Sequence, residues 1–292
     1  MSPNKGISNG FRVSRTLAGP AAKGAGQAPP NPKATAEHPP GVVPPASKKN
    51  EVAFDLGKDV KLEMVLIPAG EFKMGSLDSD QQAYPDEKPQ HRVRITKPFY
   101  LGKYLVTQEQ WQAVMGGNPS QFKGLRKPVD SVSWDDCQKF LDKLNAKFAT
   151  RPGKFRLPSE AQWEYACRAE STTRHYFGDD WSKFGEYGWY RENSRERTRP
   201  VGQKKPNAWG LYDMHGNVWE WCADWWDERD GYYAHSPTDD PPGPATGWRR
   251  ALRGGSWGDR TNYCRSASRI GQNPMGFYNG LGLRVCRVLA DK

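Results

Sequence analysis

The chain has 292 residues with a formal net charge of +10, and only 36% of its residues are hydrophobic. This length allows one large domain or two small ones with a buried core. It contains no run of 18 apolar residues, so we expect no membrane-spanning helix, and its 24 Pro and 30 Gly argue against a helical bundle or a coiled coil.

Residues 1–50 differ in composition from the rest of the chain. They contain nine of the 24 Pro, one aromatic residue, and seven basic residues against one acidic residue. Such a segment cannot bury enough apolar surface to offset its conformational entropy, so we expect a disordered basic arm. No apolar stretch follows its basic residues, which argues against a secretory signal and favours a cytoplasmic location.

The positive charge is weak support for a nucleic-acid or anionic-lipid partner. The arm carries +6 of the net charge, its basic residues are scattered, and no aromatic residues are interleaved with them for base stacking. We therefore expect no nucleic-acid partner. A nucleic-acid complex would weaken steeply with salt and would be lost when residues 1–50 are removed.

Residues 51–292 have the composition of a single globular domain, and all 12 Trp lie there. Strands are predicted over Lys61–Ile67, Glu71–Gly75 and His91–Ile95, with a turn between the first two. The Trp side chains are expected to serve mainly as packing material, because a loop-rich domain needs large side chains to bury area.

Three helix starts carry the spacing of a capping box, in which a hydroxyl and an acid or amide three residues later bind free backbone N–H groups. The pairs are Thr107 and Gln110, Ser133 and Asp136, and Ser159 and Gln162. After Cys167 no pattern indicates a long helix, and turn dipeptides separate short aromatic stretches. These features predict an α+β fold with few regular strands in its second half and long ordered loops.

The cysteines show no CxxC pair and no zinc-ligand spacing. They are Cys137, Cys167, Cys222, Cys264 and Cys286. Because five is an odd number, at least one thiol is free or pairs with another chain. Without an export signal, buried and reduced thiols are the expectation.

Five sequence motifs, referred to below as phrases, together resemble those of a known protein family. They are Met64–Gly75, Arg156–Cys167, Trp209–Cys222, Leu252–Trp257 and Gly282–Arg284. In this order they closely resemble the formylglycine-generating enzyme family, also called sulfatase-modifying factors, over roughly residues 52–289. The resemblance implies a single-domain, C-type-lectin-like α+β fold with little regular structure. It also implies oxidation of a target protein cysteine to formylglycine by oxygen.

The copper chemistry of that family has a strict residue requirement. Its oxidases use two cysteines, five residues apart after a Gly-Gly-Ser, to bind Cu(I) and the substrate thiol, because Cu(I) selects soft thiolates. Counted from Ser256, these positions are Asp259 and Cys264. At most one of the two cysteines is therefore present, and we do not expect Cu(I) to bind.

Cys264 has two interpretations under this resemblance. It is a catalytic thiolate if the chain is active. Counted backwards from Gly282–Arg284, it instead falls near the position of a structural cysteine of the family. In that case Cys264 is the partner of Cys167, either as two thiols or as a disulfide. The structural interpretation is the favoured one.

The Gly-Asn-Val-Trp-Glu-Trp element suggests a calcium site. In the family the matching loop binds a structural Ca²⁺, which would use the side chains of Asn217 and Glu220 and the carbonyls of Gly216 and Val218 here. Ca²⁺ accepts six to eight oxygens of mixed type, so this composition is suitable. The alternative is that Asn217 and Glu220 only form hydrogen bonds within the loop.

The stretches Gly258–Tyr263 and Ile270–Leu281 lie between the phrases Leu252–Trp257, Cys264–Arg269 and Gly280–Arg284. The family resemblance makes this region an exposed binding surface around the active-site cleft. The expected cleft residues are Trp257, Asp259, Tyr263, Arg265 and Arg269. A related group, the variable proteins of diversity-generating retroelements, resembles this chain and varies the same region for ligand binding, a task for which Tyr, Asn, Ser and Gly are suited.

These features support more than one function. The favoured interpretation is a family member without the complete copper pair, which either binds a protein or peptide ligand or acts as a divergent oxidase in the same cleft. The alternative is an active formylglycine-generating oxidase that uses Cys264. A lesser alternative is a retroelement-diversified binding protein.

Overall fold

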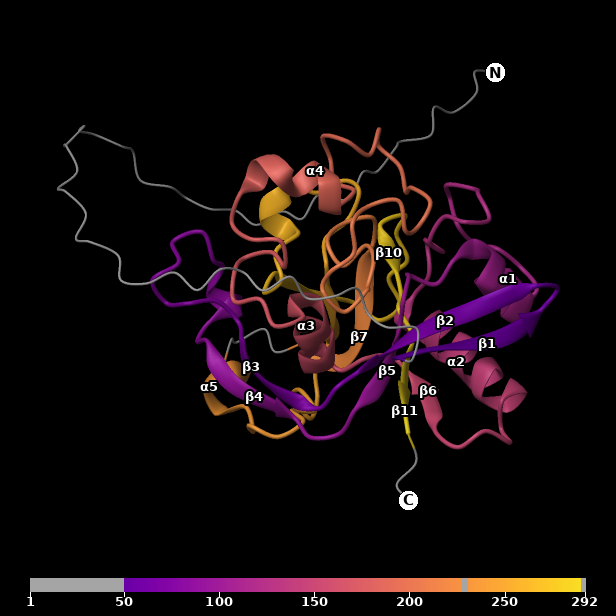
Figure 1. The fold of residues 1–292 in the computed structure, drawn as a ribbon, viewed down its shortest axis with the longest axis horizontal. Helices are drawn as coiled ribbons and strands as arrows, with labels where there is room; N and C mark the ends of the chain where they lie inside the picture. The colour runs from indigo at the N-terminus through magenta and orange to yellow at the C-terminus, as the bar shows by residue number, and fades with distance from the viewer. Residues whose placement is uncertain (1–49, 227–230, 290–292) are drawn as a thin grey trace. The chain divides into compact units, whose positions relative to one another are not determined.

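The computed structural model describes residues 50–226 and 231–289, which are coloured in Figure 1. The predicted disordered arm, residues 1–50, lies outside the described residues except for Asn50. All described residues belong to one compact unit, Pro45–Lys292. Within the described ranges, no helix has both the length and the apolar character needed to cross a membrane.

The largest sheet joins the two ends of the domain. Its strands are β1 (Glu51–Gly57), β2 (Val60–Ile67), β5 (Phe99–Gly102), β6 (Lys154–Arg156) and β11 (Cys286–Val288). They follow the order β1-β2-β5-β11-β6, and every neighbouring pair is antiparallel. The last strand in the chain therefore lies inside the sheet that the first strand begins, as Figure 1 shows.

A second sheet contains parts of three of the five phrases, Trp209–Cys222, Leu252–Trp257 and Gly282–Arg284. It consists of β7 (Trp219–Trp226), β8 (Arg249–Arg253), β9 (Arg269–Gln272) and β10 (Leu281–Gly282), in the order β10-β7-β8-β9. The second half is thus more regular than predicted. The pattern misses β7 because most of its side chains are buried whichever way they point, so polar and apolar residues do not alternate.

The third sheet is the pair β3 (Gly70–Met74) and β4 (His91–Ile95), which are antiparallel. The predictions for β2, β3 and β4 are confirmed within one residue at each end. A long loop, residues 75–90, connects β3 to β4 and carries the short 3-10 turn Pro85–Glu87.

The three predicted helices are confirmed, and each begins with both hydrogen bonds of its capping box. They are α1 (Gln108–Met115), α2 (Trp134–Lys147) and α3 (Glu160–Arg168). After α3 the described helices are only four residues long, α4 (Phe184–Tyr187) and α5 (Tyr232–His235), as predicted from the lack of helical pattern there.

Trp side chains fill much of the interior. Trp163, Trp219 and Trp221 are fully buried, and each indole N–H has an acceptor. Because the Trp163 indole of α3 donates to Glu220 of β7, this ring fixes α3 against the second sheet. Trp248, by contrast, is 87% exposed and takes no part in the core.

Candidate functional site

The Gly-Gly-Ser turn after β8 holds Asp259 in place. Its Oδ2 accepts hydrogen bonds from the indole Nε1 of Trp219 (2.8 Å), from the backbone N–H of Ser256 (3.0 Å) and from the Ser256 hydroxyl (2.5 Å). Burial raises the pKa of this carboxyl group, while these hydrogen bonds lower it. The side chain therefore acts inside the turn, and it is buried rather than presented to a ligand.

Cys264 lies directly beneath the same turn and is fully buried. A Cβ atom added to Gly255 would lie 2.4 Å from its Sγ, which shows how closely the turn covers the thiol. Burial raises the pKa of Cys264 well above its usual range, so the thiol is neutral at physiological pH. Because the thiolate is the form that binds copper and attacks electrophiles, this environment does not fit a catalytic cysteine.

Of the two forms that the sequence leaves open for Cys167 and Cys264, thiols or a disulfide, the structure has the thiols, since all five cysteines are free and buried. The Sγ of Cys167 lies 3.7 Å from the hydroxyl of Ser266 and 4.0 Å from Nδ1 of His215. Ser266, two residues beyond Cys264, thus lies where a partner cysteine would be needed. Burial raises the pKa of Cys167 to about 12.

Glu220, a predicted calcium ligand, has a cation partner from the protein itself. Arg284 donates from Nε to Oε2 and from Nη2 to Oε1, both at 2.9 Å, and Trp163 Nε1 donates to Oε2 at 2.8 Å. Both ionic side chains are fully buried. The Arg284 guanidinium neutralises the carboxylate and takes up both of its oxygens.

The Asn217 side chain is bound to the main chain of a segment 18 residues earlier. Its Oδ1 accepts from the N–H of Arg199 at 3.0 Å, and its Nδ2 donates to the Arg199 carbonyl at 3.1 Å. The side chains of both predicted calcium ligands, Asn217 and Glu220, therefore form hydrogen bonds within the protein, as the alternative interpretation of this element expects. Among the described residues no three His, Cys, Asp or Glu side chains form a group that could hold a metal ion.

Two of the predicted cleft residues belong to buried ion pairs. Arg269 donates from Nε and Nη2 to the carboxylate of Glu160, both at 2.6 Å, and Arg265 binds both oxygens of Glu87 at 2.5 Å. Each of these four side chains is at most 4% exposed. Their role is to join distant segments, and neither guanidinium is free to bind a ligand.

The other predicted cleft residues pack against aromatic rings. Trp257 donates from Nε1 to the carbonyl of Asn279 at 2.9 Å and contacts Phe122 edge to face. Tyr263 stacks on Tyr84, with 5.5 Å between the ring centroids. Of the five predicted cleft residues, Asp259, Arg265 and Arg269 are thus buried, while Trp257 and Tyr263 are partly exposed.

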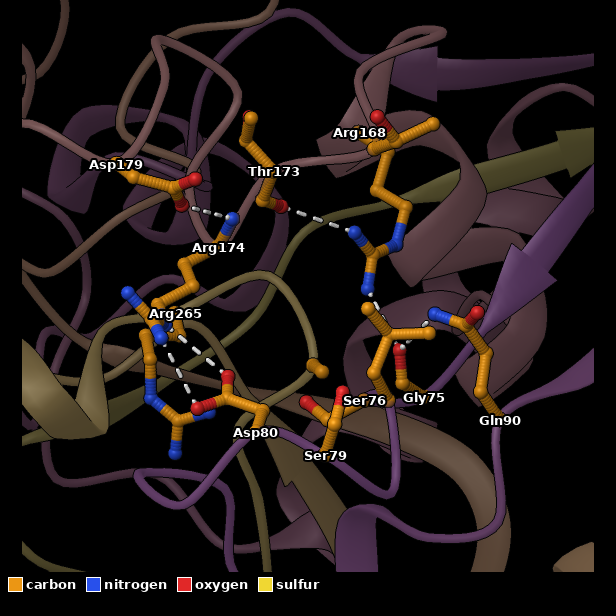
Figure 2. Close-up of a pocket in the computed structure, with 13 residues that line it drawn as sticks. Gly75, Ser76, Ser79, Asp80, Gln90, Arg168, Thr173, Arg174, Asp179 and Arg265 are labelled. Carbon is orange, nitrogen blue, oxygen red and sulfur yellow. Dashed lines mark hydrogen bonds and ion pairs between the residues drawn. The ribbon is translucent and has the colours of Figure 1, made fainter. Parts of the chain in front are cut away.

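A polar pocket of about 230 Å³ lies between the loop of residues 75–90 and the end of α3 (Figure 2). Arg168, Arg174 and Arg265 line it, and Arg174 binds both carboxylate oxygens of Asp80 at 3.0 Å. The hydrogen bond from Arg174 lowers the pKa of Asp80 despite its partial burial. Since each of the three guanidinium groups is paired with a carboxylate, the pocket offers an anionic ligand no uncompensated charge.

A larger groove of about 880 Å³ adjoins this pocket. Its walls are residues 70–73 of β3, Tyr165 and Arg168 of α3, and residues 170–172. We call it the edge groove. No sequence motif indicates either hollow, because their walls come from segments about 90 residues apart in the chain.

The loop of residues 273–280 is the exposed part of the predicted binding surface. Met275, Phe277 and Tyr278 are 72%, 67% and 43% exposed. The loop is nevertheless fixed at both ends, since Trp134 N–H donates to the Pro274 carbonyl at 2.9 Å and Ser131 N–H to the Tyr278 carbonyl at 3.1 Å. A rigid loop that displays apolar side chains is suited to contact with another protein.

Comparison with known proteins agrees with this framework. The family model of the sulfatase-modifying factor enzyme 1-like domain matches residues 51–289. The formylglycine-generating enzyme of Streptomyces coelicolor is 32% identical over 288 residues, which covers 75% of this chain and 87% of the relative. The chaperone protein LppX of Paenibacillus barcinonensis is 30% identical over 272 residues, covering 77% and 89%.

A solved structure supports the fold as well. Variable protein 1 of Treponema denticola superposes with a TM-score of 0.72 at 31% identity, covering 81% of this chain and 98% of that one. This likeness confirms the predicted C-type-lectin-like α+β fold. The chain therefore belongs to the formylglycine-generating enzyme, or sulfatase-modifying factor, family.

Proposed function

We propose that this family member binds a protein or peptide ligand and does not carry out copper-dependent cysteine oxidation. The observation that supports it most strongly is the state of the two positions that match the copper cysteines when counted from Ser256. One is Asp259, a hard oxygen donor held by three hydrogen bonds, and the other is Cys264, a neutral thiol without solvent contact. Neither side chain offers the soft, accessible thiolate that Cu(I) requires.

The loop of residues 273–280 is the proposed contact surface. It displays Met275 and Phe277, and a large exposed aromatic on a fixed backbone loses little conformational entropy when it is covered. A relative that is named as a chaperone protein supports a function in protein binding. The likeness to a variable protein favours the same region and keeps ligand-binding diversification as a second candidate.

Incubation with Cu(I), oxygen and a Cys-x-Pro-x-Arg peptide should leave the peptide cysteine unchanged. Mass spectrometry measures the result, and the Streptomyces coelicolor enzyme, run in parallel, provides the positive control. Formylglycine product that disappears in a Cys264→Ser variant would establish the alternative function, an active oxidase. Product that persists in that variant would indicate a divergent oxidase that does not use this thiol.

Replacing Phe277 by Ser should reduce partner binding at least tenfold while the melting temperature changes by less than about 2 °C, because the ring is 67% exposed and packs little in the free protein. Proteins retained by the immobilised chain from its native extract are quantified by mass spectrometry. The matched control is Trp248→Ser, which removes an even more exposed ring outside the loop. Equal losses in both variants would mean non-specific hydrophobic adsorption and would contradict the proposed surface.

A further inference from the structure

Strand β3 is paired on one side only. Its neighbour is β4, and Glu71 lies opposite Arg94 in their antiparallel register. On its far side, the N–H of Arg94 donates to the Thr238 carbonyl at 2.7 Å, and its carbonyl accepts from the N–H of Asp240 at 2.9 Å. Since both main-chain groups of Arg94 point away from β3, Glu71 and Arg94 form a non-hydrogen-bonded pair.

The position of this non-hydrogen-bonded pair determines which main-chain groups of β3 face outward. In an antiparallel ladder, the two residues of a non-hydrogen-bonded pair both direct their N–H and C=O groups away from each other. Glu71, and Lys73 two residues further on, therefore direct theirs toward the free edge, while Phe72 bonds to β4. No described residue forms a hydrogen bond with the main chain of Glu71 or Lys73.

The edge groove runs beside these unpaired groups. It is lined by four consecutive residues of β3, Gly70–Lys73, and by residues of α3 and the segment 170–172. Pro68, Ala69, Leu77, Gln90 and Arg92 complete the lining. Phe72 and Tyr165 pack together with 5.2 Å between their ring centroids and give the groove an apolar floor. Its volume of about 880 Å³ is at the upper end of the range for small-molecule sites, which suits a short stretch of peptide.

We propose that the edge groove binds an extended peptide segment of a partner protein, which adds to β3 as a further strand. A row of unpaired N–H and C=O groups repeated every second residue is a template for another strand, and a small molecule does not reproduce that spacing. The apolar floor would receive one side chain of the peptide. Around it, Glu71 and Glu170 offset Lys73 and Arg92, and Arg168 is already paired with Glu164, so the site favours peptides of low net charge. This site is separate from the loop of residues 273–280 and does not depend on the function proposed for that loop.

The test uses fluorescein-labelled hexapeptides that alternate Thr with Val, Leu, Phe, Tyr, Lys or Glu, measured by fluorescence anisotropy. Lys73→Pro should weaken the best peptide about tenfold or more, because Pro removes the outward N–H and leaves a buried peptide carbonyl unpaired. Lys73→Ala, the matched control, removes the same side chain but keeps the N–H and should bind within about twofold of the wild type. N-methylation of alternate amides of the peptide should abolish binding to the wild type.

Hydrogen exchange tests the same geometry without a variant. In the free protein the amides of Glu71 and Lys73 should exchange fast and that of Phe72 slowly, and the bound peptide should slow the first two. The proposal is overturned if no peptide of the panel binds, or if Lys73→Pro and Lys73→Ala bind equally. It is also overturned if the amides of Glu71 and Lys73 already exchange slowly in the free protein. Slow exchange would mean that another part of this chain covers the edge, or that a second copy does, which sedimentation would detect.

Discussion

Replacing Glu160 by Gln should lower the free energy of unfolding by about 3–5 kcal/mol, the usual cost of removing one partner from a buried ion pair. Glu160 accepts from Nε of Arg253 at 2.8 Å and from Nε and Nη2 of Arg269 at 2.6 Å. Gln keeps the size of the side chain but removes its charge, so two buried guanidinium groups lose a common counter-ion.

The same variant should change how stability depends on pH. Burial by itself raises the pKa of Glu160, but the charges of Arg269 and Arg253 outweigh it and hold the pKa below its usual value of 4.5. A depressed acid pKa contributes stability above the unfolded value, and this contribution is lost as the pH falls toward the folded value. The difference in stability between wild type and Glu160→Gln should therefore shrink below about pH 4.5.

Urea unfolding of both proteins between pH 3 and pH 7 measures these effects. Glu71→Gln is the matched control, because Glu71 pairs with Arg92 at the surface, where the two side chains are 39% and 63% exposed. Such a pair contributes less than about 1 kcal/mol. If the two variants lose equal stability at pH 7, the buried network does not have the role assigned to it.

This network explains how a loop-rich domain keeps one structure. Glu160 begins α3, Arg253 ends β8 and Arg269 begins β9, and Nη1 of Arg269 also donates to the Asp86 carbonyl at 3.0 Å. Four segments therefore share a few charged groups. Since each charge is satisfied only when all partners are in register, alternative packings of these loops leave a charge buried and unpaired.

The features that the sequence predicts correctly are those whose partners are close along the chain. The capping pair of Ser159 and Gln162 is three residues apart, and both hydrogen bonds are present in the structure. Alternation in His91–Ile95 likewise reflects one buried face, and β4 has those bounds. Local rules suffice in such cases, because the sequence separation nearly fixes the spatial separation.

The site is less predictable because its contacts are distant in sequence. Arg265 and Glu87 are 178 residues apart, and neither has a local pattern that marks the other as its partner. An arginine between two variable-looking stretches is therefore predicted to line a binding cleft, although its guanidinium is buried. Cys167 shows the same problem, since its thiol contacts Ser266, 99 residues away, and no local pattern marks the two as partners.

Replacing Gly255 by Ala should cost about 3 kcal/mol of the free energy of unfolding, combining backbone strain and overpacking. Gly255 has φ +78°, a left-handed conformation that costs a residue with a Cβ about 1–2 kcal/mol. The new methyl group would also lie 2.4 Å from Sγ of Cys264 and 3.1 Å from its Cα, so the turn and the buried thiol must move apart. Gly116→Ala is the control for strain alone, because Gly116 has φ +86° and a methyl group added there would meet nothing within 4 Å.

The contact with Cys264 can be isolated by a double-mutant cycle. Cys264→Ala removes the sulfur atom, so it should recover about 1 kcal/mol or more of the cost of Gly255→Ala and none of the cost of Gly116→Ala. Only part is recovered, because the Cα and Cβ of residue 264 remain close to the turn. Additive effects in both cycles, measured by urea unfolding, would mean that the turn does not rest on this thiol. A coupling confined to Gly255 would assign Cys264 to packing beneath the turn.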